Sequence, residues 1–178
     1  PAWAKLSMEM QAETGEEYAP FITLGSQPLY SHIIHHYQFL ATKSEIIFVM
    51  PPDAPDFRIP GLNQKNIKIL RISASHSIGE TVSHALAGTG SDTSLIVHMG
   101  DTLISTKPFD ESDNIVYVNE RKDTYRWTTI QKNTNSAIDI FHDRDLISGG
   151  EIQTICIGVF LFDNAFLFSE KLAEALHN

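Results

Sequence analysis

Cysteine and basic residues are both scarce in this 178-residue chain, and each scarcity excludes something. The one cysteine, Cys156, cannot form an internal disulfide, and it lies in the apolar run TICIGVFLF, which is typical of a buried side chain. Only 13 Lys and Arg residues stand against 22 Asp and Glu, and the resulting net charge of −9 disfavours nucleic acid or an anionic membrane as a partner. We therefore expect a cytoplasmic protein that binds small molecules or other proteins.

Long apolar runs are missing as well. No run approaches the roughly 20 residues that a membrane-spanning helix needs, and PAWAKLSMEM at the start lacks the uninterrupted apolar core of a signal peptide. What the chain does contain is 42% hydrophobic, 10% aromatic and 20% charged residues, an ordinary composition for a folded domain with a sizeable core. This composition predicts one soluble domain and disfavours disorder.

Strand-like and helix-like segments alternate in the first half of the chain, which predicts βαβ units. The expected helices cover 31–42 and 79–88, and the expected strands cover 45–50, 67–72 and 93–100. Four prolines within 51–61 require an extended loop, because proline fixes φ and removes a backbone donor. Later strands, separated by turn residues, are expected at 115–120, 125–133, 137–143 and 153–162. We predict an α/β fold, three-layer and Rossmann-like, with a mixed, mainly parallel central sheet.

The segment LIVHMGDTLIS, residues 95–105, ends a strand of buried character with Gly100 and Asp101. A carboxylate at this point lies at the carboxyl edge of the sheet, where open α/β folds bind their ligands. The glycine allows a ligand or backbone to come close, and the carboxylate can hold a hard divalent cation beside phosphates. The alternative is that the pair forms only a turn after the strand.

Five segments, in order along the chain, resemble motifs of the sugar-phosphate nucleotidyltransferases. They are YAPFITLGSQPLYSHII (18–34), GETVSHAL (79–86), LIVHMGDTLI (95–104), KDTYRWTTIQKNTNSAIDIFHDRD (122–145) and IGVFLFDNAFLF (157–168). The fourth is similar to the capsule and surface-polysaccharide members. The resemblance implies a GT-A-like nucleotidyltransferase fold over residues 1–178 as a single domain. It also implies transfer of a nucleotidyl group from a nucleoside triphosphate to a sugar 1-phosphate, with release of pyrophosphate.

The same resemblance implies roles for individual residues. Asp101 would be the catalytic residue and would bind Mg²⁺. The residues near the nucleotide would be Ser77, Gly79, Glu80, Thr81 and Gly100. The residues lining the sugar pocket would be Glu120, Tyr125, Asp143, Arg144 and Gly158. Such chemistry is mostly positioning and charge neutralisation, so it also requires a loop that holds phosphates and basic side chains beside it.

The chain departs from the family at the segment that holds the triphosphate. The family opens with A-A-G-x-G-(S/T)-R, whereas PAWAKLSM places Ala4 and Leu6 at the glycines and Met8 at the arginine. Ala19 replaces a lysine that contacts the reacting phosphates in the family. Lys5 offers a displaced positive charge, for which a solvated surface position is the favoured interpretation. The loss of two positioned cations predicts impaired nucleotidyl transfer.

Other residues that suggest chemistry have simpler interpretations. His32, His35 and His36 have the helical spacing of a metal-binding face, but packing and surface roles are favoured because no acidic or cysteine partner shares that spacing. Trp127 could stack on a sugar or base, but an aromatic in a half-buried strand more often packs in the core.

Three functions stay open at this point. The first is an active nucleotidyltransferase, and the second is a noncatalytic domain of the same fold that binds a nucleotide or sugar phosphate. The third, a glycosyltransferase-like domain, is weakest because GDT offers one aspartate where that class uses D-x-D. The chain starts at the phosphate loop and stops before the family's second metal aspartate, so we expect either a fragment truncated at both ends or a reduced relative. The oligomeric state is open, a homo-oligomer included.

Overall fold

The computed structural model describes residues 5–37, 44–56, 66–73, 75–87, 93–105, 114–122, 127–132, 138–141 and 152–177. The chain divides into two compact units. Unit 1 comprises Pro1–Thr93, Gly100–Asp110 and Asn164–Asn178, and unit 2 comprises Ser94–Met99 and Glu111–Asp163. The single domain expected over 1–178 stays a prediction. Within the described ranges, no helix is long and apolar enough to cross a membrane.

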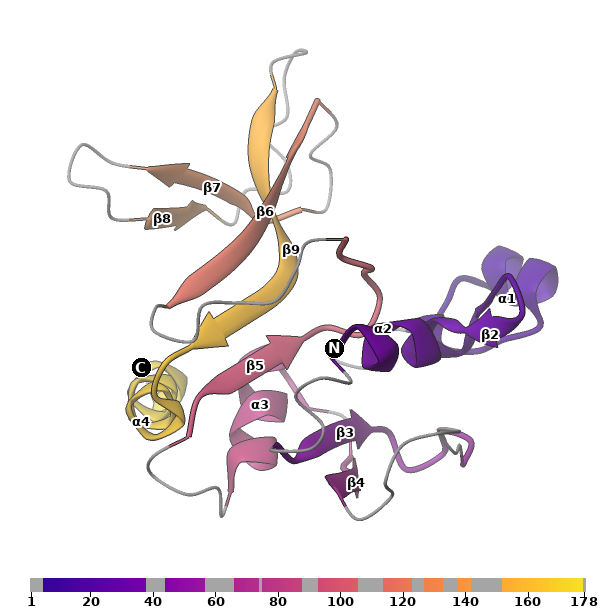
Figure 1. Ribbon diagram of the computed structural model, residues 1–178, viewed down its shortest axis with the longest axis horizontal. Coiled ribbons are helices and arrows are strands. Elements are labelled where there is room, and N and C mark those ends of the chain that lie inside the picture. Colours follow the sequence, from indigo (N-terminus) through magenta and orange to yellow (C-terminus); the bar gives the residue numbers. More distant parts are fainter. Residues whose placement is uncertain are drawn as a thin grey trace. The chain divides into compact units, whose positions relative to one another are not determined.

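Unit 1 contains the helices of the structure and two small sheets (Figure 1). Its elements are α1 (Met8–Thr14), η1 (Ala19–Phe21), β1 (Thr23–Leu24), β2 (Gln27–Pro28), α2 (Leu29–Tyr37), β3 (Ile46–Met50), β4 (Ile67–Arg71), α3 (Ile78–Leu86) and α4 (Ala165–His177). Strands β1 and β2 form an antiparallel hairpin, and β3 pairs in parallel with β4. A buried cluster of Tyr18, Phe21, Met50 and Ala54 joins η1 to the end of β3.

Unit 2 is a sheet built on the long strand β9 (Gln153–Phe162). Its other strands are β5 (Leu95–His98), β6 (Ile115–Arg121), β7 (Thr129–Lys132) and β8 (Ile138–Phe141). β9 pairs antiparallel with β5, β6 and β7, and β8 pairs with β7. Ile155, Val159 and Leu161 of β9 are at most 1% exposed, so this strand supplies the core of the unit. Cys156 on the same strand is half-buried, and burial raises the pKa of its thiol.

The expected helices and strands are confirmed where the structure describes them, but their pairing differs from the prediction. Among the described strand pairs, β3 with β4 is the parallel one, and the mainly parallel sheet is not confirmed. The alternation of strand and helix up to residue 100 suggested that β5 would have a parallel neighbour. Its described neighbour is β9, which runs antiparallel to it. The three-layer arrangement stays a prediction.

Gly158 is a point of close contact inside unit 2. Its φ is 77°, in the left-handed region that favours glycine, and a β-carbon there would lie 2.6 Å from Cγ of Met99. The Met99 N–H donates to the Gly158 carbonyl oxygen at 3.0 Å. The pairing of β6 with β9 also shifts register between Val116 and Val118, opposite this part of β9. A glycine inside a strand commonly marks such an irregularity, because backbone or side chains approach closely there.

We expect Gly158→Ala to lower the free energy of unfolding by about 2–5 kcal/mol, since left-handed strain of about 1–2 kcal/mol is joined by about 1–3 kcal/mol of overpacking against Met99. Gly25→Ala is the matched control, because Gly25 also has a positive φ (67°) but nothing lies within 4 Å of a β-carbon there. Urea unfolding of both variants makes the comparison. Equal losses would show that the contact with Met99 contributes nothing.

Candidate functional site

Gly100 and Asp101 follow the end of β5, and Gly100 lies beside η1 of unit 1. Gly100 has a φ of 84°, and a β-carbon there would lie 3.6 Å from Cγ of Pro20. Asp101 is exposed, and its Oδ1 accepts a hydrogen bond from the Thr102 hydroxyl at 3.1 Å. Two of the segments singled out in the sequence, YAP and GD, therefore meet within one unit. The Asp101 carboxylate is exposed, so a ligand can reach it from solvent.

A metal held by the protein alone has no site in the described part of the chain, where no group of three or more His, Cys, Asp or Glu residues could hold an ion. His32 Nε2 lies 2.9 Å from the Leu24 carbonyl oxygen, and His35 Nδ1 lies 2.7 Å from that of Ser31. These backbone contacts agree with the packing roles favoured for the histidines. Asp101 by itself fits only a cation such as Mg²⁺ that keeps its waters and shares ligation with phosphates.

The residues assigned to the nucleotide by resemblance gather at the first turn of α3, where most of them stabilise the helix. Ser77 is the N-cap, and its Oγ accepts from the Glu80 N–H at 3.1 Å. Glu80 Oε2 accepts from the His76 N–H at 2.6 Å, which completes a variant of the capping box. Thr81 Oγ1 lies 2.5 Å from the Oγ of Ser75, a residue only 5% exposed. These polar groups already have partners inside the protein.

Gly79 has a packing role in the same turn. A β-carbon on Gly79 would lie 3.1 Å from Leu172 Cδ1 and 3.5 Å from Leu176 Cδ2, both on α4. The missing side chain therefore lets α3 and α4 approach closely. The contact with α4 has no signal in the sequence. The capping was not predicted, although the S-x-x-E pattern of Ser77 and Glu80 signals a helix start.

Of the residues assigned to the sugar pocket, the structure describes two, both in unit 2. Glu120 is an exposed residue of β6 opposite Thr154 of β9, and Gly158 lies farther along β9. Tyr125, Asp143 and Arg144 lie outside the described residues. Trp127 is half-buried, and the Arg121 guanidinium lies 6.0 Å from the centre of its ring. This ring thus has a cation as a neighbour within unit 2.

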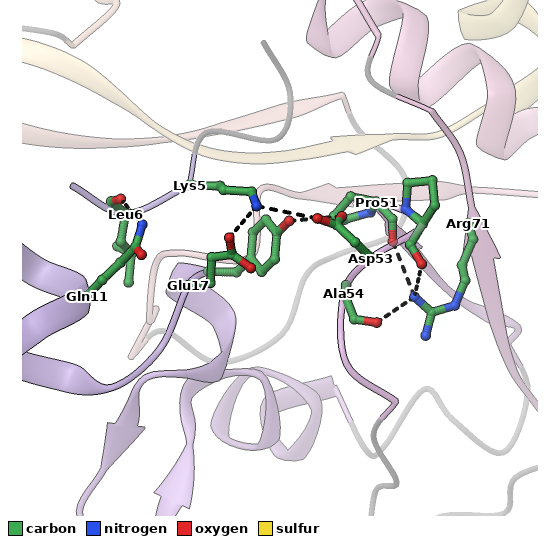
Figure 2. Close-up of polar contacts among 10 residues, drawn as sticks. Lys5, Leu6, Gln11, Glu17, Pro51, Asp53, Ala54 and Arg71 are labelled. Carbon is green, nitrogen blue, oxygen red and sulfur yellow. Dashed lines mark hydrogen bonds and ion pairs between the residues drawn. The ribbon is translucent and has the colours of Figure 1, made fainter. Parts of the chain in front are cut away.

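Lys5 lies in a polar cluster of unit 1 that sequence reasoning missed (Figure 2). Its Nζ binds Glu17 and also lies 3.4 Å from Asp53 Oδ2, and the Tyr18 hydroxyl donates to Asp53 Oδ1 at 3.0 Å. The hydrogen bond with Glu17 raises the pKa of Lys5, and the hydrogen bond from Tyr18 lowers the pKa of Asp53. The Lys5 side chain is 45% exposed, which agrees with the surface position that we expected, and it is paired with carboxylates of the protein.

Arg71, the last residue of β4, organises the loop of residues 51–56 (Figure 2). Its Nη1 donates to the carbonyl oxygens of Pro51 at 3.2 Å, Pro52 at 3.3 Å and Ala54 at 2.7 Å. Its Nη2 lies 2.5 Å from Asp56 Oδ1. The proline-rich sequence indicated an extended loop, but nothing in it indicated which cation would satisfy its carbonyl oxygens.

Comparison with known proteins identifies the fold. No protein-family model matches the chain, and no curated protein matches it in sequence. The crystal structure of an apo UDP-glucose pyrophosphorylase, a sugar nucleotidyltransferase, does match in structure. The TM-score is 0.61 at 14% sequence identity, over 98% of this chain and 78% of that chain. The chain therefore has a nucleotidyltransferase-like fold.

Removal of the N-cap hydroxyl tests the structural role of α3's first turn. We expect Ser77→Ala to lower the free energy of unfolding by about 1 kcal/mol, because the Glu80 N–H loses its acceptor. Ser26→Ala, at an exposed position of the β1–β2 turn, should change stability by less than about 0.5 kcal/mol. Urea unfolding measures both. A Ser77→Ala variant as stable as the parent would show that the cap contributes nothing and would leave the hydroxyl for a ligand.

Proposed function

We propose that the chain is a nucleotidyltransferase-like domain related to the enzymes that make NDP-sugars, which binds a nucleotide or sugar phosphate but transfers nucleotidyl groups poorly. The shared fold with a UDP-glucose pyrophosphorylase supports the first part. The position of Asp101, exposed just after β5 and next to Gly100, supports a ligand at this point of unit 1. The similarity of 122–145 to capsule-type enzymes supports a setting in surface-polysaccharide synthesis.

The pairing of Lys5 with carboxylates supports the proposal that the chain transfers nucleotidyl groups poorly. The transfer reaction needs positive charge at the phosphates, and the segment beside Gly100 offers Ala19 and Pro20 instead of a lysine. The cation nearest in sequence, Lys5, is bound to the carboxylates of Glu17 and Asp53. Its charge is therefore paired with carboxylates of the protein itself.

The backbone of the same segment is used in a similar way. A loop that holds phosphates does so with free N–H groups, often at a helix start. Here the Leu6 N–H donates to the Glu17 carbonyl oxygen at 2.9 Å, and the Met10 N–H donates to Ser7 Oγ at 3.3 Å. Met8, at the position of the family's arginine, is 86% exposed and uncharged. The Leu6 and Met10 N–H groups thus bind acceptors of the protein itself, where the family's loop binds a triphosphate.

The size of the effect favours poor transfer over efficient transfer. Loss of one preorganised charge-stabilising donor commonly lowers kcat by about 10²–10³. Two cations are replaced here, and even effects that are not additive leave little turnover. Ligand binding depends less on these groups. Contacts that the protein makes equally with the bound substrate and with the transition state are kept when contacts made only in the transition state are lost. The loss of these two cations therefore favours a noncatalytic domain that binds or senses sugar nucleotides.

A glycosyltransferase-like function has less support. That class uses a D-x-D pair of aspartates, whereas Met99 and Leu103 stand two residues on either side of Asp101. A single carboxylate can share a Mg²⁺ ion with phosphates, and such an ion would neutralise phosphate charge when it is bound. We propose Asp101 as that ligand.

The metal proposal predicts a response to Mg²⁺ that requires nucleotide and Asp101 together. Calorimetric titration of Mg²⁺ in the presence of a nucleoside triphosphate should show binding in the parent protein, and Asp101→Ala should abolish it because the only carboxylate assigned to the ion is gone. Asp163→Ala, which removes an exposed aspartate of unit 2, is the control and should leave the response intact. An unchanged response in Asp101→Ala would remove this residue from the site.

The activity proposal predicts weak or absent release of pyrophosphate from a panel of nucleoside triphosphates and sugar 1-phosphates. Release at an ordinary enzymatic rate of roughly 1 per second or more would contradict it. Lys5 and Arg144 would then be the first residues to mutate, because they are the nearest cations left in the matched segments.

A further inference from the structure

The N-terminal strap, residues 5–15, is held to the rest of unit 1 by polar contacts. None of the seven residues of α1 is buried, and Met8 and Met10 are 86% and 40% exposed, so apolar burial stabilises the strap little. Inside the strap, Gln11 Nε2 donates to the Leu6 carbonyl oxygen at 2.7 Å, and the Gly15 N–H closes the helix on the Gln11 carbonyl oxygen at 2.8 Å. These bonds keep the helix formed but do not attach it to anything else.

Lys5 and Leu6, the first two residues of the strap, attach it to the rest of unit 1. The Leu6 N–H reaches the Glu17 carbonyl oxygen, and Lys5 reaches the Glu17 and Asp53 carboxylates and lies 5.4 Å from the centre of the Tyr18 ring (Figure 2). Asp53 belongs to the loop that Arg71 holds through its carbonyl oxygens. Lys5 is therefore the cation that joins the strap to a fixed part of unit 1, 48 residues away along the chain.

The ion pairs of Lys5 are connected to the candidate site at Gly100 through Tyr18 and η1. Tyr18 is the residue before η1, and Pro20 of η1 is the neighbour of Gly100. The Lys5 side chain is about half exposed, and its ammonium group donates to two carboxylates whose side chains are also exposed. Exposed ion pairs are individually weak and easily exchanged for a competing anion. A phosphate group is such an anion, and lysine binds it as a point charge.

We propose that Lys5 is an electrostatic latch: it holds the N-terminal strap closed by binding Glu17 and Asp53, and it releases the strap when a polyphosphate binds its ammonium group. The second half rests on the proposed function, since it assumes that phosphate-bearing ligands reach this part of unit 1. Linkage makes the effect reciprocal: closure of the strap weakens polyphosphate binding, and polyphosphate favours opening by the same factor. The latch thus regulates access to the cation that the reaction would need.

Hydrogen exchange of the strap amides tests the latch directly. In Lys5→Met, the amides of residues 6–15 should exchange about three- to tenfold faster, because opening no longer breaks an ion-pair network. Lys171→Met is the matched control: Lys171 also pairs with an exposed carboxylate, Glu174, at 2.9 Å, but on α4. It should leave exchange in the strap unchanged. Equal exchange of the strap in Lys5→Met and in the parent protein would overturn the latch.

Inorganic pyrophosphate, added at constant ionic strength, tests the release. It should accelerate strap exchange in the parent protein and have no further effect in Lys5→Met. No acceleration in the parent protein would overturn release by polyphosphate, whatever the Mg²⁺ titration of Asp101 shows. Exchange in β3, which belongs to the same unit as the strap, reports whether a variant is still folded. Should Lys5→Met lose that protection, Glu17→Gln replaces it, with the same expected opening and the same contradicting result.

Discussion

The hydrogen bonds from Arg71 to the loop of residues 51–56 are the interaction on which unit 1 depends most. The loop is rich in proline, so its carbonyl oxygens have few N–H partners nearby, and one guanidinium binds three of them. The loop fixed in this way places Ala54 in the core with Tyr18 and presents Asp53 to the Tyr18 hydroxyl and to Lys5. Strand β4, the core and the N-terminal segment are thereby connected through one loop.

Under the proposed function, this arrangement would account for a nucleotidyltransferase-like fold that is retained while nucleotidyl transfer is weakened. The fold requires that β3, β4 and α3 pack and that the loop carbonyl oxygens be satisfied, and the chain meets both requirements. Transfer of a nucleotidyl group requires in addition that cations and N–H groups stay free for phosphates. In this chain the Lys5 ammonium and the Leu6 N–H bind Glu17 instead. In the proposal, the protein's own carboxylate and carbonyl groups take the contacts that a phosphate would need.

The sequence predicted what is local and missed what is distant. Apolar runs located β3, β4 and β9, and a helix-like segment located α3, because these patterns are set by residues close together in the sequence. The antiparallel pairing of β5 with β9 could not be predicted, since nothing in either strand specifies a partner so far along the chain. Lys5 could not be matched with Asp53 for the same reason. Ser77 and Gly79 were assigned to a nucleotide by resemblance. In the structure, Ser77 caps α3 and Gly79 lets α4 pack closely against α3. The packing role of Gly79 could not be predicted, because it depends on a contact with a distant part of the chain.

The central claim is that ligand binding survives where catalysis is lost, and calorimetric titration with a panel of nucleoside diphosphate sugars tests it most directly. The product of the transfer reaction carries its own sugar and base contacts and needs no cation to stabilise a transition state. The account predicts saturable binding of at least one member of the panel to the folded parent protein. Failure of every member to bind, with the protein shown to be folded, would contradict it.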